Sequence, residues 1–289
     1  MKEKKEGWRS AVMILRVDHL STTIKKKAII KEIDCNFENG VHGLLGPNGA
    51  GKTTFMRSIL GLYPQAKGKI MLDDTILPKT FVGYLPQKFG LFPNMTVRQA
   101  LTYIGNLKNM SSDILRDDIE KLISDMNLDE KLDEKMSSLS GGMVRRVGIV
   151  QAFLGNPSVV VLDEPTAGLD PEERLRFKKY IKNKKEKQII IISTHIVDDI
   201  EYLADYVEIM QEGKIIAQGT REDISRCAEH KVFGVTKEEL DNISSTYYMV
   251  KDYEDQETKK VRILLNDRCY GKELAPNLED GYLCLLKKV

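Results

Sequence analysis

A glycine-rich loop that ends in Gly-Lys-Thr is the first feature of this sequence that could do chemistry. It fits the pattern G-x-x-x-x-G-K-[ST] with Gly46, Pro47, Asn48, Gly49, Ala50, Gly51, Lys52 and Thr53. Its glycines allow backbone N–H groups to turn inward around phosphate oxygens. Lys52 would reach the β- and γ-phosphates of a nucleotide, and the Thr53 hydroxyl would ligate Mg²⁺. A glycine-rich surface turn is the weaker interpretation, because an apolar run (41–45) precedes the loop and a helical pattern (53–60) follows it.

A pair of carboxylates is the second candidate group. Asp163 and Glu164 come directly after the apolar run 159–162. Open α/β sheets bind ligands at the carboxyl ends of their strands, so both side chains are expected beside the nucleotide. Asp163 would hold Mg²⁺, and Glu164 would orient and partly deprotonate an attacking water, which is typically worth roughly 10²–10⁴-fold in rate. By itself, Asp-Glu-Pro after a strand is more often a turn that begins a helix; the phosphate loop favours the nucleotide interpretation.

Alternating strands and helices must position these groups. The sequence predicts strands at 13–17, 41–45, 159–162 and 189–192, with helices after the phosphate loop, over the charged stretch 96–138 and after residue 195. Apolar strands that alternate with helices predict an α/β fold with a mostly parallel sheet covered on both faces. After about residue 220, two strands (246–250 and 261–265) and a short helix capped by Asn277 predict a small α+β appendage.

Composition narrows the class of protein. The 289 residues predict one large domain plus a small extra one. Lys+Arg 44 against Asp+Glu 43 leaves a formal charge of +1, which argues against a broad nucleic-acid-binding face. The cysteines at 35, 227, 269 and 284 have no C-x-x-C spacing and suit reduced thiols in the cytosol. No apolar run approaches the roughly 18 residues of a membrane span, so a membrane role would require a partner chain.

The segment Leu139, Ser140, Gly141 and Gly142 distinguishes this sequence from other phosphate-loop enzymes. Together with the motifs above, it makes the chain resemble the ATP-binding cassette (ABC) family over roughly residues 14–220. The resemblance implies a phosphate-loop NTPase cassette with a mostly parallel core sheet, an antiparallel β subdomain and a helical subdomain. It also implies that the LSGG segment and Met143 complete the ATP site of a second cassette. A glycine-flanked helix N-terminus at Ser140 could face a γ-phosphate, although Ser140 alone would be a simple N-cap.

The resemblance assigns roles to further residues. Gln87, in Tyr-Leu-Pro-Gln, matches the glutamine loop that senses Mg²⁺ and the attacking water. His195 matches the switch histidine that contacts the γ-phosphate, and Asp170 matches the loop that crosses the dimer interface. Ile24 stands where the family often has an aromatic residue stacked on adenine. The expected site therefore comprises catalytic Glu164, His195 and Gln87, phosphate contacts at residues 46–54 including Thr54, and Mg²⁺ ligands Thr53, Gln87 and Asp163.

The chain is expected to divide into a polar leader (1–12), the cassette (13–220, helical subdomain about 88–138) and the appendage (221–289). The stretch from Met143 to Arg146 resembles the exporter branch that works with a separate permease. The expected partners are a second copy or a related cassette, and a multi-span permease docked near residues 88–95 on the cytoplasmic face of the membrane, with no nucleic acid.

Alternative functions stay open at this point. One is a soluble ABC ATPase on the ribosome or DNA, and another is a regulatory binder switched by nucleotide. A nucleotide kinase or GTPase is weaker, because neither needs the LSGG segment.

Overall fold

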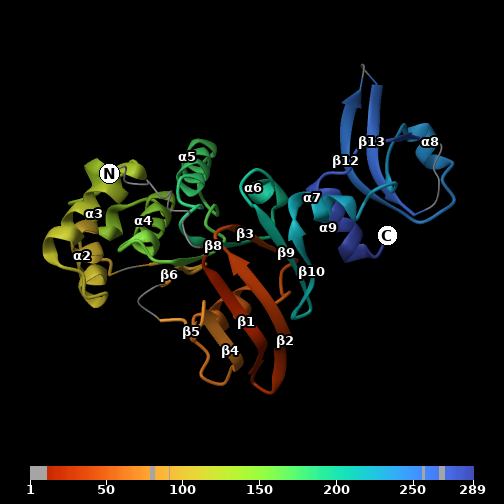
Figure 1. Ribbon diagram of the computed structural model, residues 1–289. Helices are drawn as coiled ribbons and strands as arrows, with labels where there is room; N and C mark the ends of the chain where they lie inside the picture. Colours follow the sequence, from red (N-terminus) through yellow and green to blue (C-terminus); the bar gives the residue numbers. More distant parts are fainter. Residues whose placement is uncertain (1–11, 79–81, 91, 256–257, 267–270) are drawn as a thin grey trace, which may run out of the picture.

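The computed structural model describes residues 12–78, 82–90, 92–255, 258–266 and 271–289. Nearly all of the expected polar leader, Leu91 of the expected docking segment and Cys269 lie outside these residues. Figure 1 shows three β-sheets along the chain, with helices gathered on the central one.

The central sheet has six strands in the order β10-β9-β3-β8-β7-β6. These are β3 (Gly40–Leu45), β6 (Val82–Leu85), β7 (Val159–Asp163), β8 (Ile189–Thr194), β9 (Tyr206–Gln211) and β10 (Lys214–Thr220). Neighbouring strands pair in parallel from β6 to β9, and only the edge strand β10 is antiparallel. The predicted α/β fold with a mostly parallel core sheet is confirmed.

Apolar residues on both sides of the strands explain why the sheet is covered on two faces. Every residue of β3, β7 and β8 is buried. Because successive side chains point to opposite faces, Val159 and Val161 join one hydrophobic core and Val160 and Leu162 join the other. The helix α1 (Lys52–Ile59) packs in the first core, while α4 (Gly141–Phe153) and α5 (Pro171–Lys182) pack in the second.

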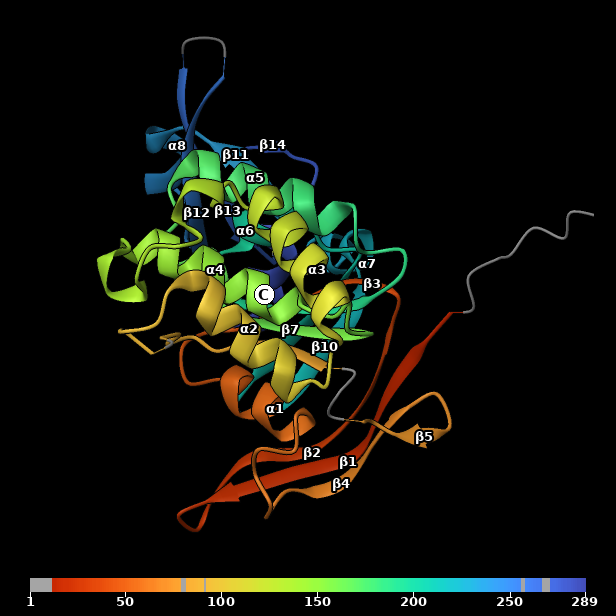
Figure 2. The same cartoon turned by 90° about the vertical axis from the view of Figure 1, so that its left-hand side faces the viewer.

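An antiparallel sheet lies beside α1, as Figure 2 shows. Its order is β2-β1-β4-β5, from β1 (Ile14–Ile24), β2 (Lys27–Glu38), β4 (Lys67–Leu72) and β5 (Thr75–Ile76). Leu15 and Val17 alternate with exposed or half-buried residues along β1 and enter the same core as Phe55 of α1. This is the antiparallel β subdomain that the resemblance implied.

A helical region follows β6. It contains α2 (Val97–Leu107), α3 (Ser112–Asp125), and 3₁₀ turns at Asp129–Lys131 and Met136–Ser138. The helix α2 begins with a capping box in which Thr96 and Gln99 bind each other's backbone N–H groups. Leu101, Leu115 and Leu122 bury one face of this helical pair in the core shared with α4. The region ends directly before the LSGG segment.

The C-terminal part forms its own antiparallel sheet, in the order β12-β13-β11-β14. It consists of α7 (Arg221–Arg226), β11 (Val232–Val235), α8 (Lys237–Asp241), β12 (Tyr247–Asp255), β13 (Thr258–Leu265), β14 (Lys272–Glu273) and α9 (Leu278–Lys287). The predicted strand 261–265 lies inside β13, and the predicted strand 246–250 overlaps β12, which begins at Tyr247; both observed strands are longer. Asn277 caps α9 as predicted.

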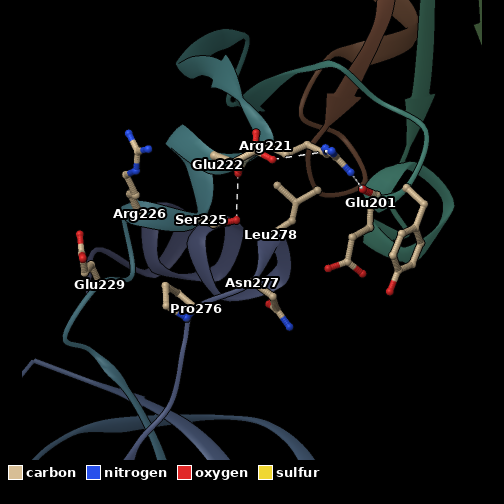
Figure 3. A pocket seen from close by; sticks show the side chains of 10 residues that line it. Glu201, Arg221, Glu222, Ser225, Arg226, Glu229, Pro276, Asn277 and Leu278 are labelled. Atoms are coloured by element: carbon tan, nitrogen blue, oxygen red, sulfur yellow. Dashed lines mark hydrogen bonds and ion pairs between the residues drawn. The ribbon is translucent and has the colours of Figure 1, made fainter.

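The helix α9 attaches this appendage to the cassette. It packs on α7 and on α6 (Val197–Glu201), the short helix after His195. A Cβ at Gly281 would lie 1.9 Å from the Ile224 carbonyl oxygen, so only glycine permits this approach. Figure 3 shows the junction, where Arg221 donates a 2.6 Å hydrogen bond to the Glu201 carbonyl and a cavity of about 480 Å³ opens beside Leu278.

Candidate functional site

The phosphate loop opens on a cavity of about 550 Å³ at the carboxyl edge of the central sheet. Most of the residues predicted for the nucleotide site line it. They are Asn48, Gly49, Ala50, Gly51, Lys52, Thr53, Thr54, Gln87, Asp163, Glu164 and His195, joined by Ile29. Apart from Ile29, they follow the ends of β3, β6, β7 and β8, which are neighbours in the sheet. The parallel arrangement therefore gathers four separate sequence segments around one cavity.

Left-handed backbone at two glycines shapes the phosphate loop. Gly49 and Gly51 have φ values of +83° and +107°, a region that L-residues with side chains rarely occupy. Gly51 caps α1, so the free N–H groups of this helix point into the loop. Pro47 and Gly46 lie at the start of the turn, where a Cβ on Gly46 would meet the Met210 carbonyl at 2.3 Å.

The Lys52 ammonium lies within this loop. Its side chain is 7% exposed, and its Nζ donates to the carbonyl oxygens of Gly46 at 2.6 Å and Pro47 at 3.2 Å. Burial lowers the pKa of Lys52, and the nearby charges of Glu164 and Asp163 oppose that shift. The position suits a cation that would bind phosphate oxygens in the adjoining cavity.

Asp163 is held by two hydroxyl groups. Thr53 Oγ1 donates to its Oδ2 at 2.8 Å, and Ser193 Oγ donates to its Oδ1 at 2.6 Å. Carboxylate and hydroxyl oxygens are ligands that Mg²⁺ accepts, and this ion commonly uses one or two carboxylates together with substrate phosphates. Among the described residues, no group of three or more His, Cys, Asp or Glu could form a metal cage. The donor set therefore fits an ion shared with a nucleotide.

Glu164 lies between two polar side chains from neighbouring strand ends. Gln87 Nε2 donates to its Oε2 at 3.1 Å, and His195 Nδ1 lies 3.0 Å from its Oε1. Its backbone has a φ of +50°, and its N–H donates to the Ser193 carbonyl at 3.1 Å. A non-glycine residue in this region is uncommon, and such conformations gather at functional sites. The turn therefore holds the Glu164 carboxylate at the cavity with only 16% of the side chain exposed. A general base could act from this position.

Two residues beyond the sequence prediction shape this site: Ile29 lines the cavity, and the fully buried Ser193 binds Asp163 without lining it. Ile29 of β2 lines it, whereas Ile24, the predicted adenine contact, is at the end of β1 and is not among the lining residues. A Cβ on Gly213 would lie 2.0 Å from the Ile29 carbonyl, so the β9–β10 turn fixes this part of β2. Ser193, which positions Asp163, precedes His195 by two residues. Apart from that closeness to His195, no sequence pattern marks it as a site residue.

The LSGG segment lies outside this cavity. Ser140 is exposed and caps α4 by accepting a hydrogen bond from the Met143 N–H at 3.3 Å. A Cβ on Gly141 would have no neighbour within 4 Å, while Leu139 and Met143 pack against the core. Asp170 is likewise exposed and caps α5 through the Glu173 N–H at 2.8 Å. Neither segment contributes to the phosphate-loop cavity of its own chain.

The fold and the site together define a phosphate-loop nucleoside triphosphatase. A loop that can cradle phosphates, a hydroxyl–carboxylate pair suited to Mg²⁺ and a positioned carboxylate are the parts that phosphoryl transfer to water requires. Comparison with known proteins identifies the family. Residues 30–167 match the family model described as "ABC transporter".

Two curated relatives extend this match. The linearmycin resistance ATP-binding protein LnrL of Bacillus subtilis is 32% identical over 219 residues, which cover 73% of this chain and 70% of that protein. The Nod factor export ATP-binding protein I of Rhizobium etli is 30% identical over 287 residues, covering 92% of this chain and 91% of the relative. A solved structure described as an ATP binding subunit of an ABC transporter aligns with a TM-score of 0.69 and 28% identity, over 74% of this chain and 92% of that one.

This chain belongs to the ABC transporter family and is one of its ATP-binding, ATP-hydrolysing subunits. No helix within the described residues combines the length and apolar character that crossing a membrane requires.

Proposed function

We propose that this protein is the motor of an exporter: it binds ATP with Mg²⁺, closes on a second cassette, and drives export through a separate membrane permease. The observation that carries the proposal is the Glu164 carboxylate, held between Gln87 and His195 beside the phosphate loop. The relatives named for linearmycin resistance and Nod factor export support the direction of transport.

Hydrolysis would use groups that already face the cavity. Lys52 would exchange the carbonyls of Gly46 and Pro47 for β- and γ-phosphate oxygens. Glu164 would accept a proton from the water that attacks the γ-phosphate, oriented by Gln87 and His195. Thr53, Asp163 and Gln87 would hold Mg²⁺, which neutralises charge that develops on the phosphates.

A second cassette would complete each site. Ser140 and Gly141 are exposed and Gly142 is half-buried at the N-terminus of α4, where free N–H groups and the helix dipole favour an anion. Because they lie outside their own chain's cavity, the γ-phosphate they would bind belongs to the other cassette. The loop at Asp170 would run along the same interface. Loss of the γ-phosphate would then remove the contact that favours the closed pair.

The permease would dock beside Gln87, at the described part of the segment 88–95. Phe92 is 46% exposed and packs edge-to-face on the 43% exposed Tyr103, with ring centroids 5.3 Å apart. Exposed apolar patches of this kind commonly mark interfaces. Phe89 packs against the core instead and would support this surface from below. In this arrangement the protein lies on the cytoplasmic face of the membrane.

Glu164→Gln tests the proposal. Without the base, phosphate release should fall by roughly 10²–10⁴-fold, while ATP stays bound and the protein elutes as a dimer in gel filtration. Glu120→Gln, the same change on the exposed face of α3, is the control and should keep both turnover and the nucleotide-dependent elution of the unmodified protein. A Glu164→Gln protein that binds ATP yet remains monomeric would contradict the sandwich.

The membrane partner needs a separate experiment. Detergent-solubilised membranes containing the tagged protein should yield a stoichiometric multi-span chain without its own cassette. Recovery with ribosomes or DNA-bound proteins instead would overturn the export assignment but leave the ATPase chemistry intact.

A further inference from the structure

A buried arginine on the LSGG helix touches both catalytic loops of its own chain. Arg145 of α4 is 6% exposed and follows Ser140 by five residues. All three of its guanidinium nitrogens donate to backbone carbonyls. Nη1 bonds Pro86 at 2.8 Å and Gln87 at 3.0 Å, Nη2 bonds Asp163 and Glu164, the latter at 2.6 Å, and Nε bonds Pro165 at 3.4 Å.

Arg145 acts as a clamp: its guanidinium binds two separate loops at once. A guanidinium is planar and offers five N–H donors in a fixed fork. Here Nη1 binds the loop that contains Gln87, and Nη2 binds the turn that contains Asp163 and Glu164. The two loops belong to different strands, β6 and β7, and Arg145 reaches both from a helix.

Arg145 is a buried charge whose donors are directed toward the cavity, unlike those of its neighbour on the same helix. Its burial lowers the pKa of the guanidinium, and the charges of Asp163 and Glu164 oppose that shift. A buried charge is costly unless its partners are well placed. The next residue, Arg146, is similarly buried but pairs with Glu173 at 2.7 Å and donates to Met126 and Asn127 carbonyls, away from the cavity.

We propose that Arg145 is a positioning residue that couples the two ATP sites of the closed dimer, an inference that rests on the function proposed above. The N-terminus of α4 faces the ATP of the partner cassette, while the guanidinium holds the backbone of Gln87 and Glu164 in its own site. Five residues of helix span about 7.5 Å. A displacement of Ser140 on closure is therefore passed along one rigid helix to the base and the glutamine of the other site.

Arg145→Lys is the decisive variant, with Arg146→Lys as a matched control on the same helix. Lysine keeps the charge but has a single nitrogen, which cannot bridge both loops. The full-length proteins would be compared for binding of a fluorescent ATP analogue without Mg²⁺, and for kcat, KM and the Hill coefficient with MgATP. For Arg145→Lys, analogue affinity should change by less than about threefold, because the variant removes no group that lines the cavity.

The rate and the cooperativity should change together. Misplacement of reacting groups by about 1 Å can cost 10²-fold, so kcat of Arg145→Lys should fall by about 100-fold. Its Hill coefficient should fall from the value of the unmodified protein, above 1, to about 1, as for uncoupled sites. Arg146→Lys should melt at a lower temperature but keep the cooperativity.

Three results would overturn the coupling: an unmodified protein that hydrolyses ATP with a Hill coefficient of 1, an unchanged Hill coefficient in Arg145→Lys, or an equal loss in Arg146→Lys. Absence of ATP hydrolysis in the unmodified protein would instead refute the proposed function, and this inference with it.

A second measurement needs no Arg145 variant. When ATP closes the Glu164→Gln dimer, hydrogen exchange should slow at the α4 N-terminus and at residues 87–88 and 164–166 together. Protection confined to α4 would also overturn the coupling.

Discussion

Replacing Asp280 with asparagine should loosen the C-terminal appendage while leaving the ATP site intact. Asp280 is fully buried at the first turn of α9. Its carboxylate accepts hydrogen bonds from Arg262 Nε at 2.9 Å and Nη2 at 2.5 Å, and from the Asn277 N–H at 2.8 Å. It therefore ties α9 to β13 and caps the same helix.

The magnitude follows from the burial of both partners. Removing one member of a buried ion pair typically costs about 3–5 kcal/mol, since the other charge is left uncompensated. Asparagine keeps one acceptor oxygen, so a loss of about 3 kcal/mol is expected. At about 1.4 kcal/mol for each factor of ten, the amides of β11, β13 and α9 should exchange with solvent about 100-fold faster.

Hydrogen exchange followed by mass spectrometry measures this region separately from the cassette. Glu279→Gln is the matched control. The Glu279 carboxylate, next to Asp280 in the sequence, is 35% exposed, and its oxygen lies 3.8 Å from Lys251 Nζ. Such pairs contribute only about 0–1 kcal/mol. Less than a tenfold acceleration in Asp280→Asn, or the same acceleration in Glu279→Gln, would refute the reasoning. ATP binding should be unchanged in both.

Three further outcomes are expected. Ser193→Ala removes the hydroxyl donor from Asp163 Oδ1 and leaves only Thr53 on Oδ2, so stability should fall by about 1–3 kcal/mol in thermal unfolding and turnover should need more Mg²⁺; an unchanged Mg²⁺ dependence would contradict the role of Ser193. Burial raises the pKa of the Cys35 thiol, so it should resist a thiolate-specific reagent at pH 8 in the native protein and react only in denaturant, as peptide mass spectrometry would show. Gly281→Ala forces a Cβ against the Ile224 carbonyl and should destabilise the α7–α9 contact by about 1–3 kcal/mol; exchange at α9 no faster than in the unmodified protein would contradict that packing.

Several features of the site could be predicted because they are local in the sequence. The phosphate loop is one unbroken segment, and its glycines are required by its own backbone. The acidic pair follows an apolar strand directly, and Asn277 caps the helix that follows it. In each case neighbouring residues carry both the signal and the structure.

Other features could not be predicted, because residues far apart in the chain make them. The lining of the cavity by Ile29 depends on how β2 is held by the turn at Gly213. Ile24, chosen by its position after the first strand, stays a prediction for adenine contact. The Arg145 clamp joins residues 18 to 59 positions away, and no spacing rule encodes such a contact.

Residue types and spacing at the phosphate loop, the acidic pair and the LSGG segment were sufficient to predict the class of chemistry, ATP hydrolysis. How the proposed catalytic groups come together depends instead on the packing of the folded chain. Gln87 and His195 stand 77 and 31 residues from Glu164, yet both reach its carboxylate. They do so because β6, β7 and β8 are adjacent parallel strands whose carboxyl ends share one edge, and strand order is set by the packing of the whole sheet.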